Sequence, residues 1–254
     1  YAHSSNGQKF EAEHRKGRLD NMPEFQSSYQ GTENLEAMEF AKNYNRFLAN
    51  LVLNAIPTNS ARILDFGAGI GTFATALTRE GRIIDCLEPD LKQGELIAQK
   101  GLKTFKSLVE ISPGSYDFIY SLNVLEHIKD DAKVVSELGD ALRLGGLAFM
   151  YVPAFNILFS SMDKFVGHHR RYNMKTLKSL FPSQKWEIVA VRYADSMGFF
   201  ASLYLKIFGK KDGRISSSLV SLYDSYLFPA SLASDRIFHR WFGKNVWIIA
   251  KRIK

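Results

Sequence analysis

The chain of 254 residues contains a single cysteine, Cys86, and no long hydrophobic run. One thiol excludes an internal disulfide, and no Cys/His cluster has the spacing of a structural zinc site, so we expect no metal. No uncharged apolar stretch reaches about 18 residues, and the polar residues 1–18 lack the apolar core of a signal peptide. We therefore expect a cytoplasmic protein, soluble or at most peripheral at the inner membrane face.

An excess of charge of one sign is missing from most of the chain. The net charge is +7, but residues 1–200 carry 23 basic and 23 acidic side chains, whereas residues 201–254 carry 10 basic and 3 acidic ones. All of the net charge therefore lies near the carboxyl end. No nucleic-acid recognition module accompanies it, and the aromatic residues there are spaced as in a packed helix, so we do not expect a nucleic-acid partner.

The rest of the composition is that of a globular protein, because 46% hydrophobic residues suffice for a continuous core. Residues 1–32 form a polar N-terminal segment, and we expect residues 33–254 to form a single domain. Apolar residues recur at near-helical spacing over 33–56, before Pro57. This pattern predicts one helix, either continuous or broken.

Short apolar runs alternate with helical patterns from residue 63 onward. The runs are Ile63–Phe66, Ile83–Leu87, Tyr116–Leu122 and Leu147–Val152, with helical patterns at 71–80 and 130–144 and a turn at Gly145–Gly146. Nearly all-apolar strands in such an alternation are typical of a parallel sheet covered on both faces. We predict an α/β fold with a doubly wound, Rossmann-like sheet that is mostly parallel, with an antiparallel last strand and helices on both faces.

The pattern is less regular after Pro153. The predicted elements are a helix at Met174–Phe181, a strand at Trp186–Tyr193, helices at 197–208 and 215–240, and a last strand at Asn245–Lys251. Residues 197–240 are therefore interpreted as a helical insertion before the last strand.

Three glycines follow the first predicted strand and open the next helix. Gly67, Gly69 and Gly71 permit a tight turn and the close approach of a ligand to the backbone. Their spacing is one residue shorter than the dinucleotide fingerprint, which argues against a nicotinamide-dependent oxidoreductase. An acidic residue at the strand end, Asp65, suits a ligand with a positively charged amino-acid end.

A second acid, Glu88, ends the next apolar run, 17 residues after Gly71. A carboxylate at this place can accept hydrogen bonds from both hydroxyls of a ribose. A tight turn with a solvated glutamate is the alternative. The series of strand, glycines, helix, strand and acid favours the binding site over that alternative.

The segment Leu64–Phe73 resembles the first motif of the class I S-adenosylmethionine-dependent methyltransferases. The similarity continues in Asn123–His127 and Leu142–Gly146 and covers residues 38–195 well. The segment Met162–Tyr172 is similar to a bacterial branch with a G-H-x-R-R-Y signature. Members of that branch often accompany genes for polysaccharide, glycolipid or secondary-metabolite biosynthesis.

This resemblance implies that S-adenosylmethionine is the cofactor and S-adenosylhomocysteine the product, without a metal. The glycine loop would contact the methionine part, Asp65 would help to hold its amino group, and Glu88 would bind the ribose. In the family an acid usually meets the adenine, and Ser107 and Leu108 stand at the matching place. The cofactor-binding residues that we expect are Asp65, Gly67, Ala68, Gly69, Gly71, Glu88, Pro89, Ser107, Leu108, Leu122 and Asn123.

Histidines are the leading catalytic candidates. An imidazole with a pKa of about 6.5 can take a hydroxyl proton at neutral pH, so we expect His168 to act as a base or as an acceptor-orienting donor. His127 is a second candidate, although it could equally cap a helix that begins there. Tyr172 completes the catalytic set, and His169, Arg170, Arg171 and Tyr44 are expected on the acceptor side.

Each of these residues also has a structural interpretation. His168–Tyr172 could be a solvated basic turn, Arg171 and Tyr172 could hold the loop by pairing with Asp163, and Tyr44 could simply pack an N-terminal helix. The apolar stripes over 197–240 fit a core or dimer interface, a lid over a lipid-linked acceptor, or peripheral membrane contact.

The resemblance therefore implies an enzyme that transfers a methyl group from S-adenosylmethionine to a small or medium acceptor, a hydroxyl of a sugar, glycolipid or secondary metabolite. The alternative is a non-catalytic sensor or scaffold that binds S-adenosylmethionine. Neither interpretation predicts an oligomeric state.

Overall fold

The computed structural model describes residues 40–209, 212 and 216–254. The predicted polar segment 1–32 and the first part of the helix predicted over 33–56 lie outside these residues. The rest of that helix is α3 (Lys42–Ala55), which ends before Pro57 as the sequence indicates.

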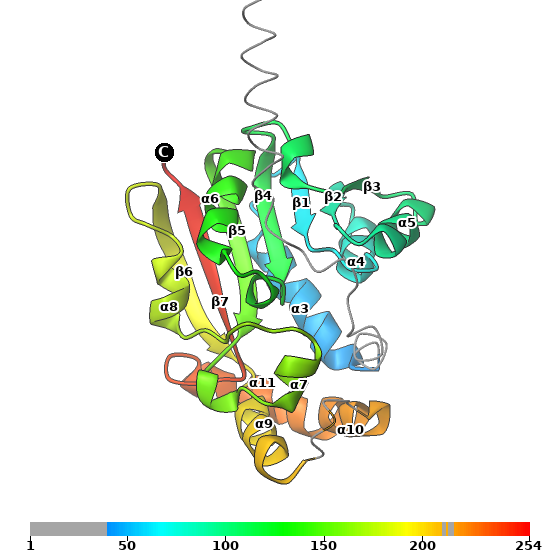
Figure 1. Cartoon of the computed structure of the whole chain (residues 1–254), viewed down its shortest axis with the longest axis vertical. Helices are drawn as coiled ribbons and strands as arrows, with labels where there is room; N and C mark the ends of the chain where they lie inside the picture. Colours follow the sequence, from blue (N-terminus) through cyan, green and yellow to red (C-terminus); the bar gives the residue numbers. More distant parts are fainter. Residues whose placement is uncertain (1–39, 210–211, 213–215) are drawn as a thin grey trace, which may run out of the picture.

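Seven strands form one sheet in the order β3-β2-β1-β4-β5-β7-β6 (Figure 1). The pairs among β1 to β5 are parallel, whereas β7 is antiparallel to both of its neighbours, β5 and β6. This arrangement confirms the predicted Rossmann-like α/β fold with an antiparallel last strand. The strands are β1 (Ile63–Phe66), β2 (Ile84–Leu87), β3 (Lys103–Phe105), β4 (Tyr116–Leu122), β5 (Leu142–Pro153), β6 (Trp186–Ala194) and β7 (Asn245–Arg252).

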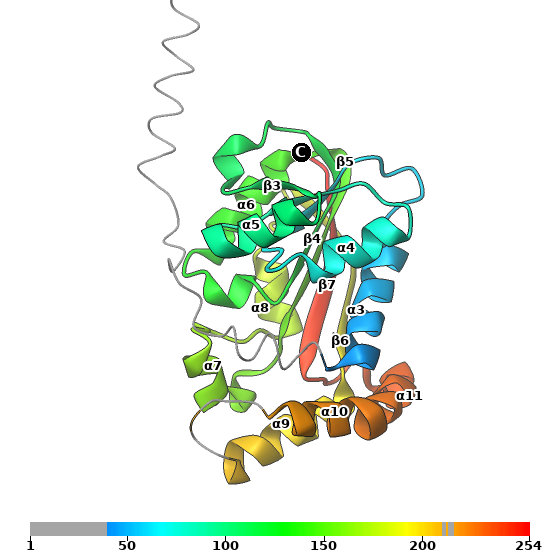
Figure 2. The ribbon, with the colours of Figure 1, turned by 90° about the vertical axis from the view of Figure 1, so that its right-hand side faces the viewer.

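Helices cover both faces of the sheet, with α3 and α4 on one side and α6 and α8 on the other (Figure 2). The buried apolar side chains divide into two clusters that correspond to these faces. Helix α5 belongs with α3 and α4, because its Ile97 lies in the same cluster as Val52 and Leu77. The helices are α4 (Thr72–Arg79), α5 (Leu91–Gln99), α6 (Asp131–Ala141) and α8 (Met174–Ser179).

Two predicted boundaries at the start of β5 are wrong. The helix predicted over 130–144 ends at Ala141, and β5 begins at Leu142, so the predicted turn Gly145–Gly146 lies within the strand. The pairing register with β4 shifts there, and Gly145 has a φ of +80°. A Cβ at Gly146 would lie 3.1 Å from the carbonyl oxygen of Asp117 on β4. These glycines therefore form an irregularity that keeps two strands close, instead of a connection between elements.

The insertion between β6 and β7 consists of α9 (Ser196–Phe208), α10 (Ser217–Leu222), the π-helical turn η4 (Tyr223–Leu227) and α11 (Phe228–Phe238). Together with α7 (Ser161–Phe165), these helices gather at the end of the sheet where the parallel strands terminate (Figures 1 and 2). In an open α/β sheet, ligands bind beyond the carboxyl ends of the strands. Among the described residues, no helix combines the length and the apolar character needed to cross a membrane.

Candidate functional site

The glycine loop joins β1 to α4 and adopts the backbone conformation that its sequence predicts. Gly67, Gly69 and Gly71 have φ angles of +76°, +57° and +77°, a region that L side chains rarely adopt. A Cβ at Gly67 would collide with the side chain of Val124, which follows β4. The N–H groups of Gly67 and Ala68 both donate to the carbonyl of Leu87, at 2.9 and 3.2 Å. The loop is thus fixed to both neighbouring strands.

Glu88 ends β2 beside this loop and is 8% exposed. Its two carboxylate oxygens accept backbone N–H groups from Gly69 (2.8 Å) and Asp90 (3.0 Å). Burial raises the pKa of Glu88, and these two hydrogen bonds oppose the rise. Asp90 also caps α5 by accepting the N–H groups of Lys92 and Gln93, so β2, Glu88 and α5 form one oriented unit. The half-buried Pro89 lies between the two acids.

Asp65 lies within β1, under the loop, and is buried. The hydroxyl of Tyr120 on β4 donates to its Oδ2 at 2.7 Å. Burial raises the pKa of Asp65 to about 7, and the nearby Glu88 adds to the increase. The carboxyl group is therefore anchored to the neighbouring strand and carries less negative charge than an exposed aspartate at neutral pH.

The expected adenine side contains an acid that the sequence comparison missed. Ser107 precedes the short 3-10 helix η1 (Leu108–Glu110), and Leu108 packs against the core. Glu110 turns back toward this place, where its Oε1 accepts from Lys106 N–H (3.2 Å) and Ser107 Oγ (3.4 Å). An acidic side chain thus stands beside Ser107 although no acid occupies positions 107 or 108. A helical turn after Ser107, which brings position 110 back beside position 107, is the signal that could have located Glu110.

Leu122 ends β4 on the same edge of the sheet, and Asn123 follows it. Asn123 has a φ of +56°, and its N–H donates to the carbonyl of Tyr151 at 2.7 Å. Tyr44 is buried, and its hydroxyl donates to that of Tyr151 at 3.2 Å. Its ring packs edge-on against Phe228, with centroids 5.2 Å apart. In this conformation Tyr44 ties α3 to the core and to the insertion.

The segment after β5 is built around one buried carboxylate, Asp163 on α7. Arg171 holds it through two hydrogen bonds, and His168 Nδ1 lies 2.7 Å from its Oδ1. Burial alone raises the pKa of Asp163, but the hydrogen bonds and charges of His168 and Arg171 outweigh it and leave the pKa well below its ordinary value. Asp163 is therefore an ionised acceptor that orients the His168 ring.

His127 and Glu126 face this segment from the other side. They end the 3-10 helix η2 (Leu125–His127), so the expectation that His127 lies where a helix begins is wrong, because α6 starts only at Asp131. The rings of His127 and His168 meet edge-on with centroids 4.6 Å apart. Burial, together with His168 and His169, lowers the pKa of His127 to about 3. His127 is therefore neutral at physiological pH.

Glu126 is fully buried, and its Oε1 lies 3.7 Å from His168 Nε2. Burial raises its pKa to about 7, an effect that His168, its own backbone N–H and Arg171 only partly offset. The sequence comparison included Glu126 in a motif without assigning it a role. The signal that could have indicated its burial is its place in the sequence, where an acid and a histidine stand between the apolar residues Leu125 and Ile128.

The remaining residues up to Tyr172 hold the segment together. Arg171 is 5% exposed and bound to Asp163, as the structural interpretation expects, so it is not part of a solvated turn. Tyr172 donates to Asp131 at 2.7 Å instead of Asp163, and Arg170 also pairs with Asp131, at 2.9 Å. The backbone N–H of His169 donates to the Glu126 carbonyl at 2.8 Å. The structure thus brings His127 and His168 together with Glu126. The two arginines and Tyr172 hold the surrounding backbone through their aspartate partners.

A second buried polar group lies between the sheet and the insertion. Asp195 has a φ of +64°, and its Oδ1 accepts from Tyr223, Ser231 and the Gly198 N–H. Lys244, before β7, places its Nζ over the rings of Tyr44 and Tyr223, 5.6 and 6.0 Å from their centroids. No local sequence pattern predicted this group, because its members come together only through the β6–β7 pairing.

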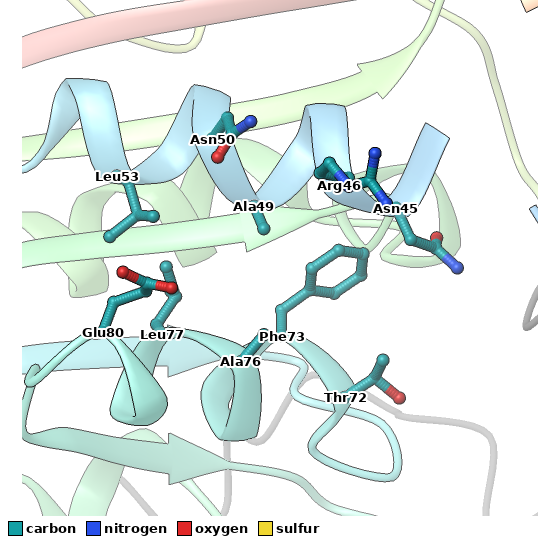
Figure 3. Close-up of a pocket in the computed structure, with 10 residues that line it drawn as sticks. All are labelled: Asn45, Arg46, Ala49, Asn50, Leu53, Thr72, Phe73, Ala76, Leu77 and Glu80. Carbon is teal, nitrogen blue, oxygen red and sulfur yellow. The ribbon is translucent and has the colours of Figure 1, made fainter. Parts of the chain in front are cut away.

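A cavity lies between α3 and α4 (Figure 3). None of the residues predicted for the site lines it. Its lining combines polar and apolar side chains: Asn45, Arg46, Ala49, Asn50, Leu53, Thr72, Phe73, Ala76, Leu77 and Glu80.

Comparison with known families agrees with this geometry. A family model described as a methyltransferase domain matches residues 38–191. Similar proteins include the ubiquinone biosynthesis O-methyltransferases of Paracidovorax citrulli, 33% identical over 104 residues, and Xylella fastidiosa, 24% identical over 147 residues. These matches cover 37% and 54% of this chain and 44% and 59% of those proteins. The chain therefore spans about half the length of these relatives.

Solved structures show the same fold at low sequence identity. A SAM-dependent methyltransferase from Archaeoglobus fulgidus has a TM-score of 0.56 at 15% identity and covers 82% of this chain and 94% of that one. Geranyl diphosphate C-methyltransferase from Streptomyces coelicolor, solved with S-adenosyl-L-homocysteine, has a TM-score of 0.58 at 12% identity, with 82% and 79% covered.

Proposed function

The chain belongs to the methyltransferase domain family, and on this premise we propose that it transfers the methyl group of S-adenosylmethionine to a hydroxyl oxygen of an acceptor that carries an apolar chain. Methyl transfer and the cofactor follow from the family. The oxygen and the apolar chain are the proposal, and the exposed apolar surface of the insertion is the observation that carries it.

The residues beyond the carboxyl ends of β1, β2 and β4 fit the cofactor. Three left-handed glycines keep side chains out of the loop, and Glu88 is held by two N–H groups with acceptor lone pairs left for ribose hydroxyls. We assign the methionine part to the glycine loop and Asn123. When bound, the cofactor supplies a methyl carbon activated by a sulfonium, and the protein aligns the acceptor and excludes water.

An oxygen acceptor is supported by the names of the relatives, which are O-methyltransferases of ubiquinone biosynthesis. Ubiquinone is a lipid, which differs from the sugar or secondary-metabolite acceptors that the sequence suggested and shares an apolar part with a glycolipid. The common chemistry is a hydroxylated head on an apolar chain. We take that chemistry as the acceptor class.

The insertion presents large apolar side chains to solvent. Phe208 and Tyr226 are 71% and 73% exposed, and Leu222 and Trp241 are also exposed. A monomeric protein rarely leaves so many apolar groups uncovered without a ligand, partner or membrane to meet them. We propose that this surface receives the apolar chain of the acceptor. The acceptor would come from a membrane that the protein contacts peripherally.

The insertion also adjoins the His168 segment. Phe155, which follows β5, packs edge-on against Phe199 of α9 with centroids 5.6 Å apart, and Lys206 Nζ donates to the Ile157 carbonyl at 2.6 Å. An apolar chain on α9 would therefore enter beside this segment. We assign to His168 a part in activating the acceptor hydroxyl, and to Asp163 and Arg171 the positioning of its ring.

A matched pair of acceptors tests this function. A phenol with an isoprenoid tail and the same phenol without it are incubated with the protein and S-adenosylmethionine, and O-methyl products are measured by mass spectrometry. We expect the tailed phenol to react with a kcat/KM at least about tenfold higher. Equal kcat/KM values, or methylation only at carbon, would contradict the proposal.

A further inference from the structure

Three side chains of metal-binding type converge beside the carboxyl end of β4. Glu126, His127 and His168 each direct one ligand atom into a common space, and these atoms all lie within 4.8 Å of one another. Glu126 and His127 belong to η2, whereas His168 comes from the segment after α7. The site is therefore assembled by the fold and has no spacing signature in the sequence.

Glu126 gives independent evidence that this space suits a positively charged ligand. The residue is 0% exposed, and within the described part of the chain no other residue donates a hydrogen bond to either carboxylate oxygen. His168 Nε2, at 3.7 Å, is too far for a hydrogen bond. A buried carboxylate without partners is costly, and folded proteins pair such groups with donors, cations or metal ions.

The two imidazoles are oriented as metal ligands. Because ionised Asp163 can only accept, the 2.7 Å contact engages Nδ1 of His168 as a donor and turns Nε2 toward Glu126. The ring of His127 interacts with the backbone at Val166 and Gly167, which holds its orientation beside the cluster. Second-shell acceptors of this kind, including a carboxylate–histidine pair, accompany most metal-bound histidines.

Arg171 completes the outer layer around the cluster. Its guanidinium binds both oxygens of Asp163, at 2.8 and 3.0 Å, and its Nη1 donates to the Ala154 carbonyl at 3.3 Å. The Asp163–His168 pair is therefore held rigidly before any ion arrives. Such preorganisation lowers the free-energy cost of binding.

We propose that Glu126, His127 and His168 bind a divalent transition-metal ion, with Zn²⁺ as the reference ion, and leave a coordination position open toward the acceptor. Two imidazoles and one carboxylate suit Zn²⁺, and three protein ligands with an open position are typical of catalytic zinc. We therefore depart from the sequence-based expectation of no metal.

The ion gives the acceptor side a chemical role, and this part rests on the proposed function. A hydroxyl oxygen at the open position loses its proton to solvent water more easily, because the ion stabilises the anion. The oxygen lone pair then forms the O–CH₃ bond as the C–S bond breaks. The sulfur keeps the electron pair and becomes the neutral thioether of S-adenosylhomocysteine.

Calorimetry with Zn²⁺ alone tests the site without any acceptor. The whole chain is first stripped with a chelator, and we expect one saturable equivalent of Zn²⁺. His127→Ala and His168→Ala should each weaken binding about 10- to 100-fold, the range seen when a metal site loses an important contact. His239→Ala is the matched control, because the His239 ring contacts the Asp235 carbonyl outside the cluster. This variant should bind Zn²⁺ with the affinity of the parent protein.

Glu126→Gln keeps the test decisive if a histidine variant fails to fold. This variant removes a buried charge while keeping the shape of the side chain, so the metal-free protein should be at least as stable as the parent. Its Zn²⁺ affinity should fall about tenfold or more, with S-adenosylhomocysteine affinity unchanged as evidence of an intact fold. Absence of saturable binding, or equal affinity in Glu126→Gln, overturns the site.

Methyl transfer separates the site from the proposed function. If the chelated protein methylates the tailed phenol as fast as the zinc-loaded protein, the catalytic role of the ion is wrong and O-methylation stands. If Zn²⁺ binds through the three residues and the phenol is not methylated, the metal site stands and the proposed acceptor class is wrong.

Discussion

Two parallel hydrogen bonds join Arg171 to Asp163, from Nε to Oδ1 at 2.8 Å and from Nη2 to Oδ2 at 3.0 Å. Both side chains are almost completely buried. The same Oδ1 lies 2.7 Å from His168 Nδ1, so the pair determines where the imidazole lies. Arg171 thus acts on the site through a carboxylate four residues before Gly167 in the chain.

We expect Arg171→Lys to destabilise the protein by about 2 kcal/mol, because an ammonium keeps the charge but cannot form two parallel bonds to a carboxylate. Urea unfolding measures the change. Arg143→Lys is the control, since Arg143 also pairs with an aspartate, Asp117, at 2.7 Å but is half-exposed. It should change stability by less than about 1 kcal/mol. Equal effects of the two variants would contradict the role of the buried pair.

Gly67→Ala should destabilise the glycine loop more than a substitution at another left-handed glycine. A Cβ at Gly67 would meet Val124, whereas a Cβ at Gly114, with a φ of +66°, would have no heavy atom of the described chain within 4 Å. We expect about 1–2 kcal/mol for Gly114→Ala from the backbone alone. Gly67→Ala should cost about 1–3 kcal/mol more from overpacking. Denaturant unfolding of both variants measures the difference, and a smaller loss in Gly67→Ala than in Gly114→Ala would refute the clash.

Glu88→Gln should weaken the binding of S-adenosylhomocysteine about tenfold or more, as measured by calorimetry. The amide nitrogen of glutamine would face one of the two N–H donors that now point at the carboxylate. Glu187→Gln is the control, since Glu187 on β6 is largely exposed. Unchanged affinity in Glu88→Gln would remove Glu88 from the cofactor site.

Asp65 should make stability fall as the pH rises. Its pKa is about 7 in the folded protein and has an ordinary value of 3.8, so between these values the folded state holds a proton that the unfolded state has released. Raising the pH therefore favours unfolding, by about 1.4 kcal/mol per pH unit between the two pKa values. Urea unfolding of the ligand-free protein from pH 4.5 to 7 should show this slope relative to Asp65→Asn. Parallel curves for the two proteins would exclude the buried carboxyl as its source.

The exposed surface of the insertion should associate with lipid. We expect the protein to sediment with anionic vesicles at low salt and less so at high salt, because 10 basic and 3 acidic side chains lie in residues 201–254. Phe208→Glu should reduce binding severalfold. Ile83→Glu changes an equally exposed apolar residue beside the start of β2 and should leave binding unchanged. Failure to sediment at low salt would rule out this contact.

The sequence predicted the cofactor half of the fold well because its signals are local. The run Ile63–Phe66, the three glycines and Glu88 occupy consecutive positions, and each residue type is required by the backbone or by burial at that place. Helix α5 and the short strand β3 were not predicted in this way. Strand β3 has only three residues and is partly exposed, so it has too few positions for a pattern.

The acceptor side was predicted less completely because its chemistry depends on tertiary burial. His168 and the Asp163–Arg171 pair lie within one short segment and were recognised together. The partner that completes the cluster, Glu126, comes from another part of the chain. Its carboxylate loses contact with hydrogen-bond donors only when the fold buries it, so no local sequence pattern reveals this property. The contact of Lys244 with the rings of Tyr44 and Tyr223 was not predicted for the same reason, because these residues are distant in sequence.

The position of β7 between β5 and β6 sets an order of assembly during synthesis. Strands β1 to β5 can pair as they leave the ribosome, and with them the glycine loop and Glu88 take shape. Strand β6 has no neighbouring strand until β7 is synthesised, so the apolar faces of β6 and of the insertion stay exposed to solvent until then. We expect folding to have a slow second phase, and the nascent chain to depend on chaperones at that stage.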